Sequence, residues 1–224
     1  MKKSILLIVA CLMLGTTASY AQLTKEQIKE RKANRKLTQS ELNAKASKAA
    51  RKDAKAFKKE GWEVMPGALP IDKQLDKSYL MQMEVDEEMF PKFIMGEAAS
   101  IGENYDAAKM QALELAKQNL AGKIQTEVTA LIENTVANEQ LEAEEAASVV
   151  QSISAAKNLI SQSIGRTIPV VEVYRTKQNK NKEVLVRLAY NAKMAKAAAK
   201  QAIREDLEKK GEALQGKLDK LLGW

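Results

Sequence analysis

The sequence contains no histidine, and its single cysteine is Cys11. Without histidine the chain cannot form Ser-His or Cys-His nucleophile pairs, and it has no histidine proton shuttle. Zinc and copper sites that depend on His and Cys ligands are excluded for the same reason. Carboxylate chemistry, Ser-Lys pairs and oxygen-ligated calcium or magnesium remain open, but no motif for them is present. We therefore predict a protein that is not an enzyme, with no cofactor and no small-molecule substrate; an enzyme that uses carboxylates or a Ser-Lys pair is the alternative.

Aromatic residues make up only 4% of the chain, so its core must consist mainly of Leu, Ile, Val, Met and Ala. Such a composition is typical of a helix-rich protein. Beyond the first residues, no apolar run is long enough to cross a membrane. The length suits one domain with an extension.

The first residues, MKKSILLIVACLMLGTTASYAQ, have the layout of an export signal. Lys2 and Lys3 precede an apolar stretch that is too short to span a bilayer. Ser19 and Ala21 are small residues at the positions that a signal peptidase inspects, which predicts cleavage before Gln22. We expect an exported protein, in the periplasm or at the periphery of the outer membrane of a Gram-negative-type bacterium.

The alternative for this end of the chain is a lipoprotein that is lipidated at Cys11, after the residues IVA. Cleavage there would leave the apolar stretch LMLGTTASYA on the mature protein, so we favour the ordinary signal. If Cys11 is removed with the signal, the mature chain has no cysteine and can form no disulfide.

The net charge of +7 is concentrated in one segment. Residues 22–60 hold 13 Lys and Arg against 5 Asp and Glu, a net charge of +8. Because the two signal lysines add +2, the chain after residue 60 carries −3. This basic segment lacks proline and is rich in strong helix formers, which predicts a helix.

The basic helix 25–60 is the strongest candidate for a binding surface. Its cations could contact anionic lipid headgroups or another polyanion, although charge runs often only face water. Nucleic acid is not expected, because an exported protein seldom meets it and Phe57 is the only aromatic residue there. The candidate contact residues are Lys32, Arg35, Lys36, Lys48, Arg51, Lys52, Lys55, Lys58 and Lys59.

Hydrophobic periodicity and turn residues divide the chain into five parts. These are a signal peptide (1–21), a basic helical extension (22–61), a connector with a short helix (62–90), an α+β domain (91–191) and a C-terminal helix (192–224). Strands are expected near 93–98, 168–175 and 183–190, and long helices from Asp106 onward and over 138–165. The predicted class is α+β, a small antiparallel three-stranded sheet packed against the two long central helices, with helical extensions at both ends.

The stretch FIMGEAASIGENYDAAKMQA, residues 93–112, has the order of a strand, a glycine turn and a helix. A phosphate-binding P-loop would need four residues between the glycines and a lysine after the second. Here five residues separate Gly96 from Gly102, and Glu103 follows. We therefore expect Gly96 to allow close packing and Asn104 or Asp106 to cap the helix.

Three further patterns bear on packing, solvation or pairing with a second copy. The alanines of the helix after Asp106 predict close packing on its own sheet, with docking of another protomer as the alternative. The acidic residues Glu142, Glu144 and Glu145 are expected to be a solvated helix start, since neighbouring glutamates on a helix point apart. In the C-terminal helix, four leucines approach heptad spacing and could pair with a second copy: Leu207, Leu214, Leu218 and Leu221.

The ordered combination of FIMGEAAS, DAAKMQALELAKQNLAGKI and VVEVYRTKQNKNKEVLVRLAY resembles the LPP20 family of bacterial envelope proteins, over residues 91–191. The resemblance implies a small exported α+β domain, often lipidated, without enzymatic activity. We expect a structural or protein-interaction role in the cell envelope, through an envelope protein partner or a homo-oligomer. The alternative is a membrane-surface or polyanion-binding module that acts through the basic helix 25–60.

Overall fold

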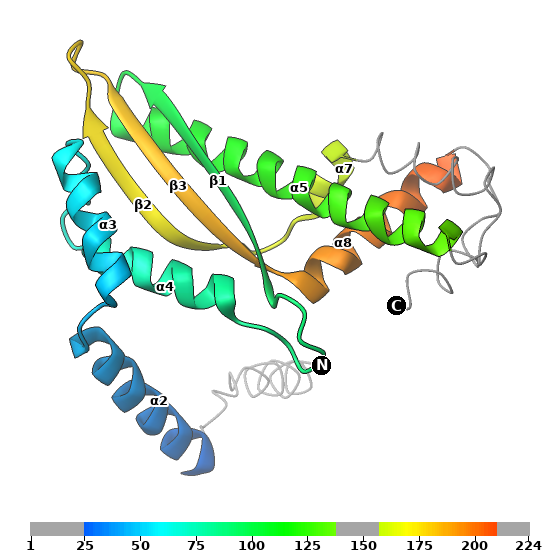
Figure 1. Ribbon diagram of the computed structural model, residues 1–224, viewed down its shortest axis with the longest axis horizontal. Coiled ribbons are helices and arrows are strands. Elements are labelled where there is room, and N and C mark those ends of the chain that lie inside the picture. The colour runs from blue at the N-terminus through cyan, green and yellow to red at the C-terminus, as the bar shows by residue number, and fades with distance from the viewer. Residues whose placement is uncertain (1–24, 138–156, 210–224) are drawn as a thin grey trace, which may run out of the picture. The chain divides into compact units, whose positions relative to one another are not determined.

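The structure is a computed structural model that describes residues 25–137 and 157–209 (Figure 1). The chain divides into two compact units, one up to residue 45 and one from residue 46 onward. The first unit contributes one described helix, α2 (Lys25–Asn43). The second contains α3 (Lys48–Lys59), α4 (Ile71–Met83), β1 (Phe93–Gly102), α5 (Tyr105–Ala137), α7 (Lys157–Ser163), β2 (Ile168–Thr176), β3 (Lys182–Asn191) and α8 (Ala192–Lys209).

The three strands form an antiparallel sheet in the order β1-β3-β2, which confirms the predicted α+β class. Strands β2 and β3 are the expected hairpin, with Tyr174 opposite Val184. Strand β1 pairs with the other edge of β3, with Gly96 opposite Leu188. It runs four residues beyond the predicted end at 98, because its pairing with β3 continues to Gly102.

Helix α5 covers one face of the sheet (Figure 1). Three of its alanines are fully buried against the inward-facing side chains of β3: Ala108, Ala112 and Ala116 against Val184, Val186 and Leu188. Small side chains let the helix axis approach the sheet closely. The alanine stripe therefore packs within its own domain, as predicted, and Arg187 points to the opposite face of the sheet, where it contacts α4.

The opposite face of the sheet is covered by α3 and α4 (Figure 1). Buried residues of these helices pack on Met95, Val171 and Val173. Of the predicted helix 138–165 the structure describes α7, where Ile160, together with Ile164 just after the helix, packs beside α5 and α8. The sheet needs an apolar layer on each face, and the N-terminal helices supply the second, which the sequence prediction had not assigned to them.

The basic segment is not one continuous helix. It breaks between α2 and α3, where the Ser47 hydroxyl accepts a hydrogen bond of 3.2 Å from the Ala50 amide and caps α3. The Ser47 amide in turn donates to the Asp76 carboxylate of α4 at 3.0 Å. The compact unit that begins at residue 46 includes α3, which packs there in the same cluster as residues of the sheet.

Two other helices combine buried and exposed apolar residues. Helix α4 stops at Met83, which is 82% exposed. In α8, Ala198 and Ile203 are buried, whereas Met194 is exposed. The side chains of the four heptad-spaced leucines lie outside the described residues, so pairing through them stays a prediction.

Candidate functional site

Helix α3 is held on the sheet by a row of small residues. Ala46, Ala50 and Ala54 are buried, and Phe57 packs against the same cluster as Trp62. Because these residues recur every three to four positions, they lie on one side of the helix. Because this side of α3 is buried on the sheet, the opposite side faces water.

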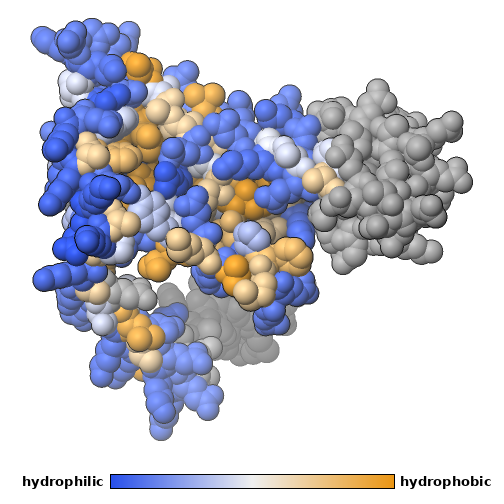
Figure 2. Space-filling view, in the orientation of Figure 1, coloured by the Kyte–Doolittle hydropathy of each residue, from blue (hydrophilic) through white to orange (hydrophobic). Residues whose placement is uncertain are grey.

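That outer side carries six cations, which we call the basic face of α3. All six residues are exposed, and each has another member of the set three or four residues away, so they share one side of the helix. Among the described residues, none of them has a carboxylate within 4.0 Å. The edge of the molecule where α3 lies is predominantly hydrophilic in Figure 2. The basic face consists of Lys48, Arg51, Lys52, Lys55, Lys58 and Lys59.

The acidic groups near α3 are turned away from this face. The single acid of the helix, Asp53, accepts a hydrogen bond of 2.7 Å from the Tyr79 hydroxyl of α4. Burial, followed by this hydrogen bond to Asp53, raises the pKa of Tyr79 to about 12. Glu60, just past the helix, accepts from the Trp62 indole at 3.2 Å. The positive charge of the basic face is consequently not neutralised from within the fold.

The C-terminal end of α3 is braced by an aromatic and ionic cluster. The guanidinium of Arg175 lies 4.5 Å from the centre of the Trp62 ring and donates to Glu183 at 2.7 Å. The hydrogen bond to Glu183 raises the pKa of Arg175, and that from Arg175 lowers the pKa of Glu183. This cluster ties the turn after α3 to the β2–β3 hairpin.

The other candidate contact residues lie on α2. Lys32, Arg35 and Lys36 are exposed on that helix, and it belongs to the other compact unit. The structure therefore divides the predicted nine-residue set between two units and brings together only the six residues of α3.

The glycine stretch forms the turn between β1 and α5, as the sequence predicted. A Cβ on Gly96 would lie 2.8 Å from the Leu120 Cβ, and one on Gly102 would lie 2.7 Å from the Ala108 amide nitrogen. The Asn104 side chain accepts from the Ala107 amide at 2.9 Å and caps α5, so Asn104 is the capping residue of the two that we considered. Backbone and side chains fill the space that a phosphate would need.

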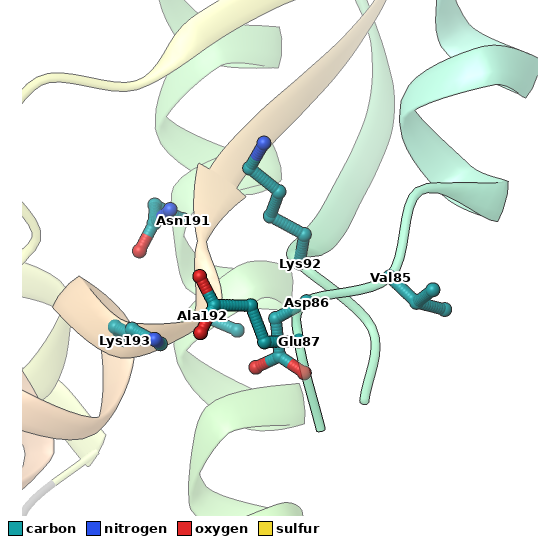
Figure 3. Close-up of a pocket in the computed structure, with 7 residues that line it drawn as sticks. All are labelled: Val85, Asp86, Glu87, Lys92, Asn191, Ala192 and Lys193. Carbon is teal, nitrogen blue, oxygen red and sulfur yellow. The ribbon is translucent and has the colours of Figure 1, made fainter. Parts of the chain in front are cut away.

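A hollow of about 420 Å³ lies where the loop after α4 meets the start of α8 (Figure 3). The Asp86 carboxylate there accepts from the amides of Glu88 and Phe90, and Asn191 caps α8 by accepting from Met194. Figure 3 shows the Lys92 ammonium pointing away from the Asp86 and Glu87 carboxylates, and its partner is the Glu84 carboxylate. Because these polar groups hold the local backbone and do not converge, the hollow is not our candidate site.

The sequence did not indicate the polar cluster between α4 and the sheet. The Arg187 guanidinium donates to Glu97 at 2.6 Å and to the Ser78 hydroxyl at 2.9 Å. A charged residue on the face of β3 opposite α5 could have signalled a partner on a covering helix, but the identity of that helix was not known from the sequence. The cluster joins α4 to β1 and β3 and has a structural role.

Further predictions concern the lipidation site, the acidic residues, metal sites and membrane spans. Cys11 and the glutamates at 142, 144 and 145 lie outside the described residues. In residues 25–137 and 157–209, no group of three or more Cys, Asp or Glu side chains could hold a metal ion. No helix in the same ranges is long and apolar enough to cross a membrane.

The chain was compared with known proteins in three ways. A scan against protein-family models, a search of curated proteins and a search of solved structures gave no match. The resemblance to the LPP20 family is therefore neither supported nor contradicted, and it stays a prediction.

Proposed function

We propose that this chain is an exported, non-enzymatic envelope protein that binds a surface bearing several phosphate groups through the basic face of α3. The observation that carries the proposal is the set of six exposed cations on a helix whose nearby acids are engaged elsewhere. This observation favours the alternative interpretation of the sequence, a surface-binding module. Binding to such a surface would hold the protein in the envelope.

The energetics of the helix support this proposal. Like charges at i and i+4, such as Lys48 and Lys52 or Lys55 and Lys59, destabilise a helix by about 0.2–0.5 kcal/mol each. The burial of Ala50 and Ala54 offsets that cost and keeps the cations in a fixed row. Because the backbone of α3 is already ordered, binding to an anionic surface costs only the ordering of the long side chains.

The anionic groups could come from lipid headgroups or from a soluble polyphosphate, since both present several phosphates to a row of lysines. A Lys near an anionic membrane surface contributes about 1 kcal/mol of binding free energy, and salt screens this contribution. The interaction should therefore weaken as the salt concentration rises.

A triple substitution in the full chain tests the proposal: Lys52→Gln, Lys55→Gln and Lys59→Gln. Binding to phosphatidylglycerol vesicles and to long-chain polyphosphate is measured at low and high salt. We expect the affinity for anionic vesicles at low salt to fall about a hundredfold, because three lysines near the surface are lost.

The matched control carries Lys117→Gln, Lys157→Gln and Lys193→Gln, which remove the same charge from α5, α7 and α8. The control should bind within about threefold of the wild type if the position of the cations matters, and not only the net charge. Equal affinities of the two variants, or no binding of the wild type to either probe, would contradict the proposal.

A further inference from the structure

The connection between α3 and α4 contains seven consecutive residues without a charge. Residues 64–70 read VMPGALP, and six of the seven are exposed. Met65 and Leu69 are 37% and 39% exposed, so part of each apolar side chain is in contact with water. An uncharged, apolar loop thus directly follows the basic helix.

This loop is held in a defined conformation. Its tip has the features of a type II turn: Pro66 at the second position, Gly67 at the third with φ +84°, and a hydrogen bond of 3.0 Å from the Ala68 amide to the Met65 carbonyl. The Leu69 carbonyl accepts a hydrogen bond of 2.7 Å from the Gln74 side chain of α4. The exposure of the apolar side chains is therefore part of the fold.

The start of the loop is fixed to the sheet as well. Glu63 and Tyr174 exchange two backbone hydrogen bonds, of 2.7 and 2.9 Å. The Glu63 carboxylate accepts from the Tyr174 hydroxyl at 3.2 Å, so its charge is engaged on the side of β2.

The loop and the basic face of α3 are neighbours. Lys58 lines a hollow of about 530 Å³ together with Val64, Ala68 and Pro70. A cation of the basic face and the apolar side chains of the loop therefore border the same space. This combination of a basic helix face and an adjoining apolar segment is what a protein needs to lie in the interface of an anionic membrane.

We propose that residues 64–70 insert into the interfacial region of an anionic lipid bilayer while the basic face of α3 contacts the headgroup phosphates. This inference rests on the proposed function and names the source of the phosphates. Met65 and Leu69 leave water for the acyl boundary, and the rigid turn requires little ordering on binding.

Charge and apolar burial together favour a bilayer over other binding partners of the loop. A soluble polyanion surrounded by water offers no apolar medium to Met65 and Leu69. A second copy that docked on the same patch through a two-fold axis would bring two basic faces together, and like charges would oppose that contact. An anionic bilayer supplies both the phosphates and the apolar phase.

The test is the full chain with Met65→Gln and Leu69→Gln, compared with a control that carries Met110→Gln and Leu115→Gln. The control removes one Met and one Leu that are exposed on α5, away from the loop. Binding to phosphatidylglycerol vesicles and to long-chain polyphosphate is measured at low and high salt. Circular dichroism and thermal unfolding establish that both variants fold.

We expect the loop variant to lose at least about tenfold in vesicle affinity, and to lose the vesicle binding that the wild type retains at high salt, because apolar burial is not screened. Its affinity for polyphosphate should equal that of the wild type. The α5 control should match the wild type on both probes.

A dye attached in a Cys11→Ser chain gives a second, direct measurement. An environment-sensitive dye at Leu69→Cys should shift to the blue on anionic vesicles, and the same dye at Met110→Cys should not. If vesicles bind but the loop variant binds like the wild type and the Leu69 dye does not shift, insertion is wrong while the proposed function stands. If neither vesicles nor polyphosphate bind the wild type, the proposed function itself fails.

Discussion

The Tyr79 hydroxyl donates a hydrogen bond of 2.7 Å to the Asp53 carboxylate, and this bond joins α4 to α3. Asp53 is the only acid within α3, so the bond holds the one negative charge of the helix on its inner side. The six cations of the outer side have no carboxylate within 4.0 Å among the described residues. This one side-chain contact thus helps to pack α3 on α4, and it also keeps the only acid of α3 away from the exposed basic face.

Replacement of Tyr79 by Phe should lower the free energy of unfolding by about 1 kcal/mol at neutral pH, the typical net contribution of a hydrogen bond. The folded-state pKa of Tyr79 is raised from 10.0 to about 12. The wild-type advantage should therefore be complete below pH 10 and shrink as the pH rises from 10 towards 12. Urea unfolding of both proteins between pH 7 and pH 11 measures this, and a difference that stays constant to pH 11 would contradict it.

Replacement of Gly96 by Ala should destabilise the protein by about 1–3 kcal/mol or more, because the new Cβ would overlap Leu120 and the still closer backbone oxygen of Ala116. Backbone cannot move aside as a flexible side chain can. Gly165→Ala is the matched control, since a Cβ there meets nothing within 4 Å. Chemical unfolding should separate the two variants clearly, and equal stabilities would show that α5 does not pack on β1 as described.

Replacement of Glu183 by Gln should cost about 1–2 kcal/mol at pH 7, because its partly buried carboxylate binds Arg175 and Lys177. These partners depress the folded pKa of Glu183 below its usual 4.5. The contribution is therefore present above pH 4.5 and is lost as the pH falls through the lower folded value. Unfolding curves of wild type and variant should converge in acid, and a gap that widens there would contradict this assignment.

Two deletions should distinguish the contribution of α2 to the stability of the fold from that of α3. Removal of residues 25–43 takes away only the described helix of the first unit and should leave the thermal transition of the second unit intact. Removal of residues 25–60 also takes away Ala50 and Ala54, which lie in the core, and should abolish cooperative unfolding. Calorimetry of both deletion variants distinguishes the outcomes, and a cooperative transition in the longer deletion would show that α3 is dispensable.

Local patterns predicted the parts of the fold in which one residue spacing dominates. Val184, Val186 and Leu188 alternate along β3, and the buried residues of α5 recur with the helical period, so the sheet class and the longest described helix followed from the sequence. The outcome for Gly96 was predicted as well, because the glycine spacing and Glu103 are incompatible with a phosphate loop.

The candidate site was predicted only in part. The cations of residues 25–60 stood out by composition, but their separation into two units did not, because alanines at 46, 50 and 54 give only a weak apolar signal. The apolar loop 64–70 was interpreted as a connector, since a sequence does not show whether Met65 and Leu69 face the core or water.

The sequence by itself determined the absence of histidine chemistry, the α+β class, the pairing of the β2–β3 hairpin and the concentration of positive charge before residue 61. These properties depend on residue types and on spacing within one element. Only the tertiary structure decided that α3 shares the second face of the sheet with α4. That choice depends on contacts between residues far apart in the chain, such as Ser47 with Asp76 and Asp53 with Tyr79, which no local period encodes.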